Sequence, residues 1–555
     1  MNLLANRKAF TRADIEPIAA AIPAERQASA RHYGVHPYFT RRPANVVRAY
    51  IERYSRMGDI VLDSFGGTGV TAIEALLSGR KAVHNDLNPF ANFITENIAD
   101  TSLPSTTPLK QAFARIEEAC APKIKTIESA AEAEMGKLLK QLPLPENIRL
   151  PSNSDAEHFF DLFTPRQLAG LAALKQAIDG ERDDHARGPL LLAWSASVAK
   201  LNKTFLSAEG RAESRGGSSI FSIYRYKLAK SVVELPIWET FKGRFLNVLS
   251  AKDEVFHLRD HFNRTQPQFP IDSAKNLTVL AQDAATLSAT LGPQSVDYIY
   301  TDPPYGAHIA YLDLSILWNH WLGFAVSDAT RQAEAIVGGE CNFSEDHYKR
   351  KLADSIRDCL VLLKPDRWLS IVFQHWDTSY FATILETASE HGADLRAAVT
   401  QERDVIWSMH KKKNSENVLS GEMILTFYKP AAHRRPGTAK KPVAQASRLR
   451  MKKTLPEILD SVLSPQSSVL HAPGLTGEFI FNQVILEAWR ENCLSALFVT
   501  REAFAHELRA RGWKYQPKTN QWSKGAALPE LLVLHEGSGT YGVTPPTQGR
   551  KRKAR

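Results

Sequence analysis

The chain has 555 residues, with 69 lysines and arginines against 60 acidic residues, and its formal net charge of +9 favours a polyanionic partner. Its hydrophobic content of 43% is ordinary for a globular protein, and no apolar run is long enough to span a membrane. The N-terminus lacks the apolar core of a secretion signal, so we expect a cytoplasmic protein. The four cysteines lack metal-ligand spacing, and neither a disulfide framework nor a metal site is predicted.

The first predicted sheet unit is a strand, a glycine-rich loop and a helix. Residues 59–63 form the strand, Ser-Phe-Gly-Gly-Thr-Gly follows at 64–69, and apolar residues continue at helical spacing. Glycines let the backbone approach a ligand closely, and the first turn of the helix offers free N–H groups. The next strand, 81–85, ends at Asp86, about 20 residues beyond the loop, where dinucleotide-binding folds place a ribose-binding acid. Because the loop lacks a Gly-Lys-Ser/Thr ending, ATP or GTP hydrolysis is excluded.

The stretch from 105 to about 270 departs from the sheet pattern and is predicted to be mostly helical. Within it, residues 220–227 interleave aromatic and cationic side chains. That sequence suits a nucleic-acid surface, but it fits a half-buried strand equally well, and both interpretations stay open. Trp238, Phe241 and Phe245 recur at helical spacing and are predicted to be core residues.

The sheet pattern resumes at 276–280, and a buried strand at 296–300 then leads into Thr-Asp-Pro-Pro-Tyr-Gly at 301–306. A strand cannot continue through two prolines, because each lacks an N–H donor and fixes φ. The chain must therefore turn, leaving Asp302 and Tyr305 at the carboxyl end of the strand, where open α/β sheets bind ligands. An acidic acceptor, rigid carbonyls and an aromatic face could hold a planar base that carries an amino group.

The predicted fold class is α/β. Further strands are expected near 368–373, 393–400 and 422–428, followed by a basic linker and a helix-plus-hairpin domain. The predicted division of the chain is 1–104 (lead-in and first half of the sheet domain), 105–270 (helical insertion), 271–430 (second half), 431–455 (basic linker), 456–540 (small C-terminal domain) and 541–555 (basic tail).

Taken together, these motifs resemble the amino-methylating DNA methyltransferases over about 36–101 and 276–430. The residues that carry the resemblance are Asp63-x-Phe65-x-Gly67-x-Gly69, Asp86, Asp283 and Asp302-Pro303-Pro304-Tyr305. In addition, His36-Pro37-Tyr38-Phe39 is similar to a motif that the family places before the glycine loop.

The resemblance implies a Rossmann-like class I methyltransferase sheet with a large, mostly helical insertion, which one family arrangement uses for target recognition, and a small C-terminal α+β domain. It implies S-adenosylmethionine as cofactor, double-stranded DNA as partner, and a restriction or defence-system protein as a further candidate partner. The cofactor-binding residues that it implies are Tyr38, Phe39, Asp63, Phe65, Gly67, Gly69, Asp86 and Asp283, and the catalytic residues are Asp302, Pro303, Pro304 and Tyr305.

The expected reaction is methylation of adenine N6. An amino nitrogen is a weak nucleophile because its lone pair is delocalised into the ring, and hydrogen bonds to Asp302 and the Pro303 carbonyl would localise that pair. The base must be flipped out of the duplex, with Tyr305 as the expected stacking platform. Aspartate before the prolines favours adenine over cytosine N4. An RNA amino-methyltransferase and an inactive nucleic-acid-binding relative remain alternatives. Cytosine C5 chemistry is excluded, because no cysteine follows a proline.

Overall fold

The computed structural model describes most of the chain. The predicted basic tail, 541–555, lies outside the described residues, as does most of the predicted linker, 431–455. The described ranges are 12–25, 31–205, 218–307, 309–401, 419, 421–431, 453–464, 467, 475–516 and 521–524.

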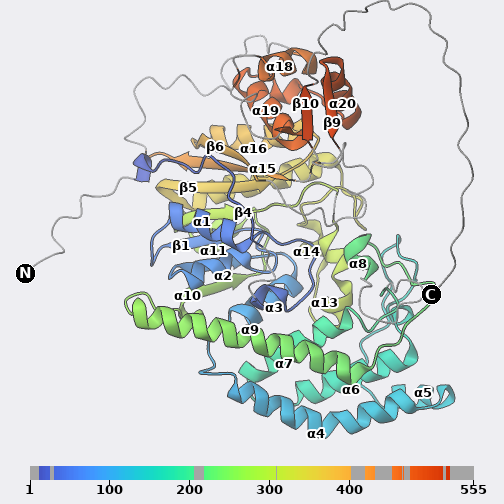
Figure 1. The fold of residues 1–555 in the computed structure, drawn as a ribbon. Helices are drawn as coiled ribbons and strands as arrows, with labels where there is room; N and C mark the ends of the chain where they lie inside the picture. The colour runs from blue at the N-terminus through green and yellow to red at the C-terminus, as the bar shows by residue number, and fades with distance from the viewer. Residues whose placement is uncertain are drawn as a thin grey trace, which may run out of the picture.

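A seven-stranded sheet forms the centre of the molecule, in the order β3-β2-β1-β4-β5-β7-β6 (Figure 1). All neighbouring pairs are parallel except the two made by β7, which is antiparallel to both β5 and β6. The strand order reverses between β1 and β4, which makes that point the expected ligand site of a doubly wound sheet. The strands are β1 (Ile60–Asp63), β2 (Lys81–Asn85), β3 (Leu277–Leu280), β4 (Val296–Thr301), β5 (Leu363–Phe373), β6 (Asp394–Gln401) and β7 (Glu422–Lys429).

A hydrophobic core lies on each face of the sheet, and successive side chains of a strand enter the two cores in turn, because they point to opposite sides. In β4, Tyr298 and Tyr300 belong to one hydrophobic core, whereas Ile299 belongs to the other. The helices of the first core include α1 (Ala44–Tyr54), α2 (Val70–Leu77), α3 (Pro89–Ala99), α12 (Tyr311–Leu314) and α13 (Ile316–Leu322); those of the second include α11 (Leu287–Leu291), α15 (Glu345–Leu362) and α16 (Thr378–Glu390). A short helix, α14 (Asp328–Gln332), precedes α15.

Between β2 and β3 the chain builds a layer of helices that extends the first core away from the sheet (Figure 1). Phe113 and Phe245 stack in this layer with ring centroids 4.0 Å apart. Phe245, Trp238 and Phe241 are all buried, which confirms the prediction that they are core residues. The helices of this region are α4 (Thr107–Ser129), α5 (Glu132–Leu139), α6 (Pro165–Asp179), α7 (Asp184–Val198), α8 (Ser219–Ser222), α9 (Ile237–Thr265) and α10 (Ser273–Asn276).

Residues 220–227 do not form the half-buried strand that one interpretation proposed. They begin in the short helix α8 and continue as irregular chain, in which Tyr224 has a positive φ of 57°. Tyr226 is buried and its hydroxyl donates to main-chain carbonyls of the 313–314 turn, so a tertiary hydrogen bond overrides the alternating pattern. The strand prediction was therefore wrong, and the nucleic-acid interpretation stays a prediction.

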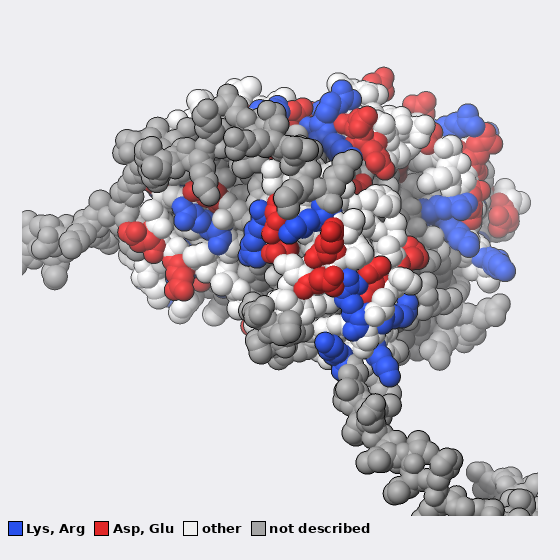
Figure 2. Space-filling view, turned by 90° about the horizontal axis from the view of Figure 1, so that it is seen from above, with Lys and Arg blue, Asp and Glu red and all other residues white. Residues whose placement is uncertain are grey.

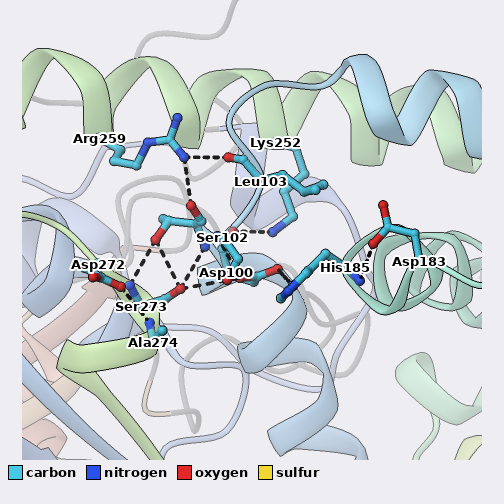
Figure 3. Close-up of polar contacts among 11 residues, drawn as sticks. Asp100, Ser102, Leu103, Asp183, His185, Lys252, Arg259, Asp272, Ser273 and Ala274 are labelled. Atoms are coloured by element: carbon cyan, nitrogen blue, oxygen red, sulfur yellow. Dashed lines mark hydrogen bonds and ion pairs between the residues drawn. The ribbon is translucent and has the colours of Figure 1, made fainter.

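Two buried cations of α9 fasten the helical layer to the segment that leaves α3 (Figure 3). Lys252 donates to the Asp100 carbonyl at 2.7 Å. Arg259 donates to the carbonyls of Thr101, Leu103 and Pro104 at 2.7, 2.6 and 3.1 Å. The bonds to Thr101 and Leu103 satisfy buried carbonyls in an irregular segment, and leaving such carbonyls without a donor would cost stability.

The C-terminal residues form a helical unit with a small sheet of order β8-β10-β9 on the opposite side of the main sheet (Figure 1). Trp376 of the main domain packs against Phe481 at 4.7 Å between ring centroids. On the face seen in Figure 2, basic and acidic side chains of the described residues are interspersed. The elements are α18 (Leu455–Val462), β8 (Leu475–Thr476), α19 (Gly477–Arg490), α20 (Arg501–Ala510), β9 (Trp513–Gln516) and β10 (Gln521–Lys524). Within the described ranges, no helix is both long enough and apolar enough to cross a bilayer.

Candidate active site

A cleft of about 1000 Å³, including the solvent space at its mouth, opens where the strand order reverses. It is lined by residues from both halves of the sheet domain and from the segment before α1. Among the predicted site residues, those that line it are Tyr38, Asp63, Phe65, Gly67, Asp86, Asp283, Asp302 and Pro304. Phe39, Gly69, Pro303 and Tyr305 are not part of its lining.

The glycine loop and the Asp-Pro-Pro-Tyr turn meet because β1 and β4 are paired in parallel. Leu62 of β1 lies opposite Ile299 of β4, so both strands end at the same edge. Just beyond, the hydroxyls of Ser64 and Thr301 are 2.9 Å apart. Parallel pairing therefore brings the two motifs to one edge of the cleft, although a long helical region separates them in sequence.

Two glycines of the loop have left-handed backbone conformations that favour glycine. Gly67 has a φ of +53°, and a Cβ placed on it would approach only the Tyr38 ring, at 4.0 Å. Gly69 has a φ of +78°, and its Cβ would lie 2.3 Å from the Thr95 side chain. Gly67 therefore leaves its side of the cleft open, whereas Gly69 allows the close packing of the loop against α3.

The acids that follow β1 and β2 are held by local hydrogen bonds. Asp63 accepts from the Phe65 N–H at 3.1 Å and the Thr71 hydroxyl at 2.6 Å. Asp86 accepts from the N–H groups of Gly67 and Asn88 at 2.7 and 2.8 Å. Burial raises the pKa of Asp63 to about 7 and that of Asp86 to about 6. Both carboxylates are therefore poorly solvated and are suited to binding a cation or hydroxyl groups.

Asp283 is already engaged with a cation. Its carboxylate pairs with Lys351 at 2.6 Å and accepts from the Ala285 N–H at 3.0 Å. The Tyr38 ring lines the cleft next to the glycine loop, 4.0 Å from the position of a Cβ on Gly67. Phe39 instead packs behind it, against Phe221 at 5.4 Å between ring centroids.

Asp302 forms a bidentate ion pair with Arg42, which was not predicted from the sequence. Arg42 Nε lies 2.5 Å from Asp302 Oδ2, and Nη2 lies 2.7 Å from Oδ1. The Tyr305 hydroxyl accepts from Arg42 at 2.6 Å and donates to Asp302 at 2.9 Å. The Tyr305 ring packs edge-on against Phe373, and the Pro304 carbonyl accepts from the Tyr348 hydroxyl at 2.5 Å. These contacts fix the turn before any ligand binds.

Two further residues that line the cleft, Arg41 and Glu334, were not predicted from the sequence. Arg41 is partly buried, and its guanidinium donates to the Thr68 hydroxyl at 3.0 Å and to the His36 carbonyl. No Asp or Glu among the described residues forms an ion pair with it, and burial lowers its pKa to about 10. Glu334 also lines the cleft, and burial raises its pKa to about 8. Neither residue belongs to a recognisable motif, although Arg41 lies two residues after the His-Pro-Tyr-Phe stretch.

Comparison with known proteins points to the same segment of the chain. Residues 20–96 match the family model of the DNA methylases, of the N6/N4 type. The resemblance to the amino-methylating DNA methylases is confirmed. The Type II methyltransferase M.MjaII of Methanocaldococcus jannaschii is 28% identical over 79 residues, which are 14% of this chain and 15% of that protein. The match to this relative thus spans less than a sixth of its length. Residues 20–96, which we call the methylase region, include the 36–43 segment, β1, the glycine loop and β2.

Proposed function

We propose that this chain transfers a methyl group from S-adenosylmethionine to the N6 amino group of adenine in DNA. The observation that carries the proposal is the opening of the glycine loop and of Asp302 into one cleft at the switch point of the sheet. Adenine is proposed over cytosine because aspartate, rather than serine, precedes the two prolines.

The charges of the cleft fit the proposed cofactor, which supplies an electrophilic methyl group on a sulfonium. The partly buried Arg41, which has no carboxylate partner among the described residues, suits the cofactor's carboxylate. Asp63 and Asp86 offer acceptors for its ammonium and ribose hydroxyls, and the open space at Gly67 admits the ligand close to the backbone. Lys351 pairs with Oδ2 of Asp283, so Asp283 would accept a hydrogen bond from the cofactor's adenine amino group through a lone pair that this ion pair does not use.

The base would enter beside Asp302, after leaving the duplex stack. Because Tyr305 does not line the cleft and its hydroxyl is bonded to Asp302 and Arg42, we extend the proposed stacking role to Tyr311, which does line it. The reaction then depends on positioning and on fixed charges rather than on a covalent intermediate.

The test is transfer of tritiated methyl groups to duplex DNA and to tRNA, followed by digestion and separation of the labelled nucleosides. We expect label in N6-methyldeoxyadenosine from DNA and no label in the nucleosides from tRNA. Label in N4-methyldeoxycytidine would overturn the choice of base, and label only in tRNA would overturn the choice of polymer. The absence of transfer to either would contradict the proposed activity.

A further inference from the structure

The chain between α8 and α9 exposes two adjacent apolar side chains. Ile223 is 40% exposed and Tyr224 is 37% exposed. Single apolar side chains are common on a protein surface, but adjacent large ones point to a binding surface. We call Ile223 and Tyr224 the tip.

Two anchors on either side of the tip hold it next to the cleft. Before the tip, Phe221 packs against Phe39 at 5.4 Å between ring centroids, and Phe39 packs edge-on against Tyr311 at 5.5 Å. After the tip, the Tyr226 hydroxyl donates to the main-chain carbonyls of the 313–314 turn at 3.1 and 2.8 Å. Both anchors therefore end on α12 or on the Tyr311 side chain, which lines the cleft where the base is proposed to enter.

The hydroxyl of Tyr311 lies within electrostatic reach of both the tip and the proposed acceptor. Burial raises the pKa of Tyr311 above its usual range, and the negative charges of Asp302 and of an ionised Tyr224 would raise it further. Charges interact over short distances only in such a setting. Tyr224 is thus a near neighbour of the position that the extruded base would occupy.

The backbone of the tip is held in an unfavourable conformation. Tyr224 has a φ of 57°, in the left-handed region that residues with a side chain rarely adopt. Such residues persist where surrounding contacts impose them, and they gather at ligand-binding sites. Here the anchors at Phe221 and Tyr226 impose the conformation.

Cations flank the tip on its C-terminal side. Arg225, Lys227 and Lys230 are all exposed. Arg225 pairs with Asp155, whereas no Asp or Glu among the described residues forms an ion pair with Lys227 or Lys230. An apolar tip followed by cations without acidic partners complements the stacked bases and the phosphates of a DNA duplex.

We propose that the tip is a wedge that enters the DNA duplex and fills the gap left in the base stack when the target base swings into the cleft. This inference rests on the proposed function, which requires an extruded base. Extrusion unstacks the neighbouring bases, and apolar side chains inserted between them offset that cost. Lys227 and Lys230 would bind the phosphates beside the gap.

The test measures binding to two short duplexes of one sequence by fluorescence anisotropy. One duplex is intact, and the other has a single tetrahydrofuran abasic residue at its centre, which supplies the gap without extrusion. We expect the wild-type protein to bind the abasic duplex about fivefold or more tightly than the intact one. The Ile223→Ala, Tyr224→Ala double variant should bind the two duplexes within about twofold of each other, because it loses the stacking contact.

Two control variants distinguish stacking from a general loss of apolar surface. Tyr224→Phe keeps the ring and should keep the wild-type preference. Leu246→Ala removes another apolar side chain, 53% exposed on α9, and should also keep it. Thermal unfolding of each variant confirms an intact fold.

The outcomes separate this inference from the proposed activity. Equal affinity of the wild-type protein for the two duplexes, or a preference that the double variant retains, would overturn the wedge even if methyl transfer is observed. A preference that depends on the tip in a protein without methyl transfer would support the wedge and contradict the proposed activity. Equal losses in the double variant and in Leu246→Ala would also overturn the inference.

Discussion

Single residues set the electrostatic character of the cleft. Asp63, Asp86 and Glu334 are all acids whose pKa burial raises, to about 7, 6 and 8 respectively. Arg41 is a partly buried cation in the lining of the same cleft. The cleft thus holds acids that are partly protonated near neutral pH and that a cationic ligand would ionise.

At this scale we expect the affinity for S-adenosylmethionine to increase as the pH rises from about 5.5 to 8. Because their pKa values are raised, the carboxyl groups of the free protein are partly protonated in this pH range. A cationic ligand binds the ionised carboxylates more tightly than the protonated acids. Binding therefore releases protons. Calorimetry in buffers of different ionisation enthalpy measures that release. Asp86→Asn should reduce it, and binding that is independent of pH would contradict the assignment of these acids to the cofactor.

The same raised pKa values fix the sign of a stability effect. Asp63 and Asp86 bind protons more tightly in the folded state than in the unfolded chain, where an aspartate has a pKa of about 3.9. Their contribution to stability is therefore full below about pH 4 and is lost as the pH rises through 6 to 7.

The two loop glycines should respond differently to alanine. Gly67→Ala places a methyl group in the cleft, so we expect weaker cofactor binding with a loss of about 1 kcal/mol in stability from the left-handed backbone. Gly69→Ala forces a methyl group against Thr95, so we expect about 2 kcal/mol or more of destabilisation from overpacking. Urea unfolding and calorimetry measure the two effects. Wild-type affinity in Gly67→Ala would show that the ligand does not approach the loop.

At the scale of elements, α9 is fixed to the sheet domain by its buried cations. Arg259→Ala would leave the carbonyls of Thr101, Leu103 and Pro104 without their donor. We expect a loss of about 2–4 kcal/mol in the free energy of unfolding, measured with urea. Lys242→Ala on the same helix removes a half-exposed pair with Glu117 and should change stability by less than about 1 kcal/mol. Similar losses in both variants would contradict this role of Arg259.

The elements were largely predictable where periodicity and turn chemistry agree. The strands before the glycine loop and before Asp302 fall where the sequence predicts them, because apolar runs there end at glycines and prolines. The conformation of residues 220–227 was not predictable from periodicity, because the tertiary hydrogen bonds of Tyr226 decide it. The ion pair between Arg42 and Asp302 could not be predicted, since it joins segments that are 260 residues apart in the sequence.

At the scale of the whole molecule, the pairing of β1 with β4 brings together the glycine loop and the Asp-Pro-Pro-Tyr turn, which lie far apart in the sequence. Helices α4 to α9 lie between β2 and β3 in the sequence, but they pack as a layer beyond one face of the sheet (Figure 1). None of the residues that line the cleft at the β1–β4 switch point belongs to these helices. The division into six segments and the assignment of 105–270 to target recognition stay predictions. The cleft that results places the methylase region and the Asp-Pro-Pro-Tyr turn in one site.

The most direct measurement combines methyl transfer and cofactor calorimetry on Asp302→Ala, with thermal unfolding to confirm an intact fold. The account predicts that transfer falls by about a thousandfold or more, because the amino group loses its acceptor. Cofactor affinity should stay within about threefold of wild type, because Asp63, Asp86 and Arg41 remain in place. Transfer at the wild-type rate in a folded Asp302→Ala protein would contradict the account.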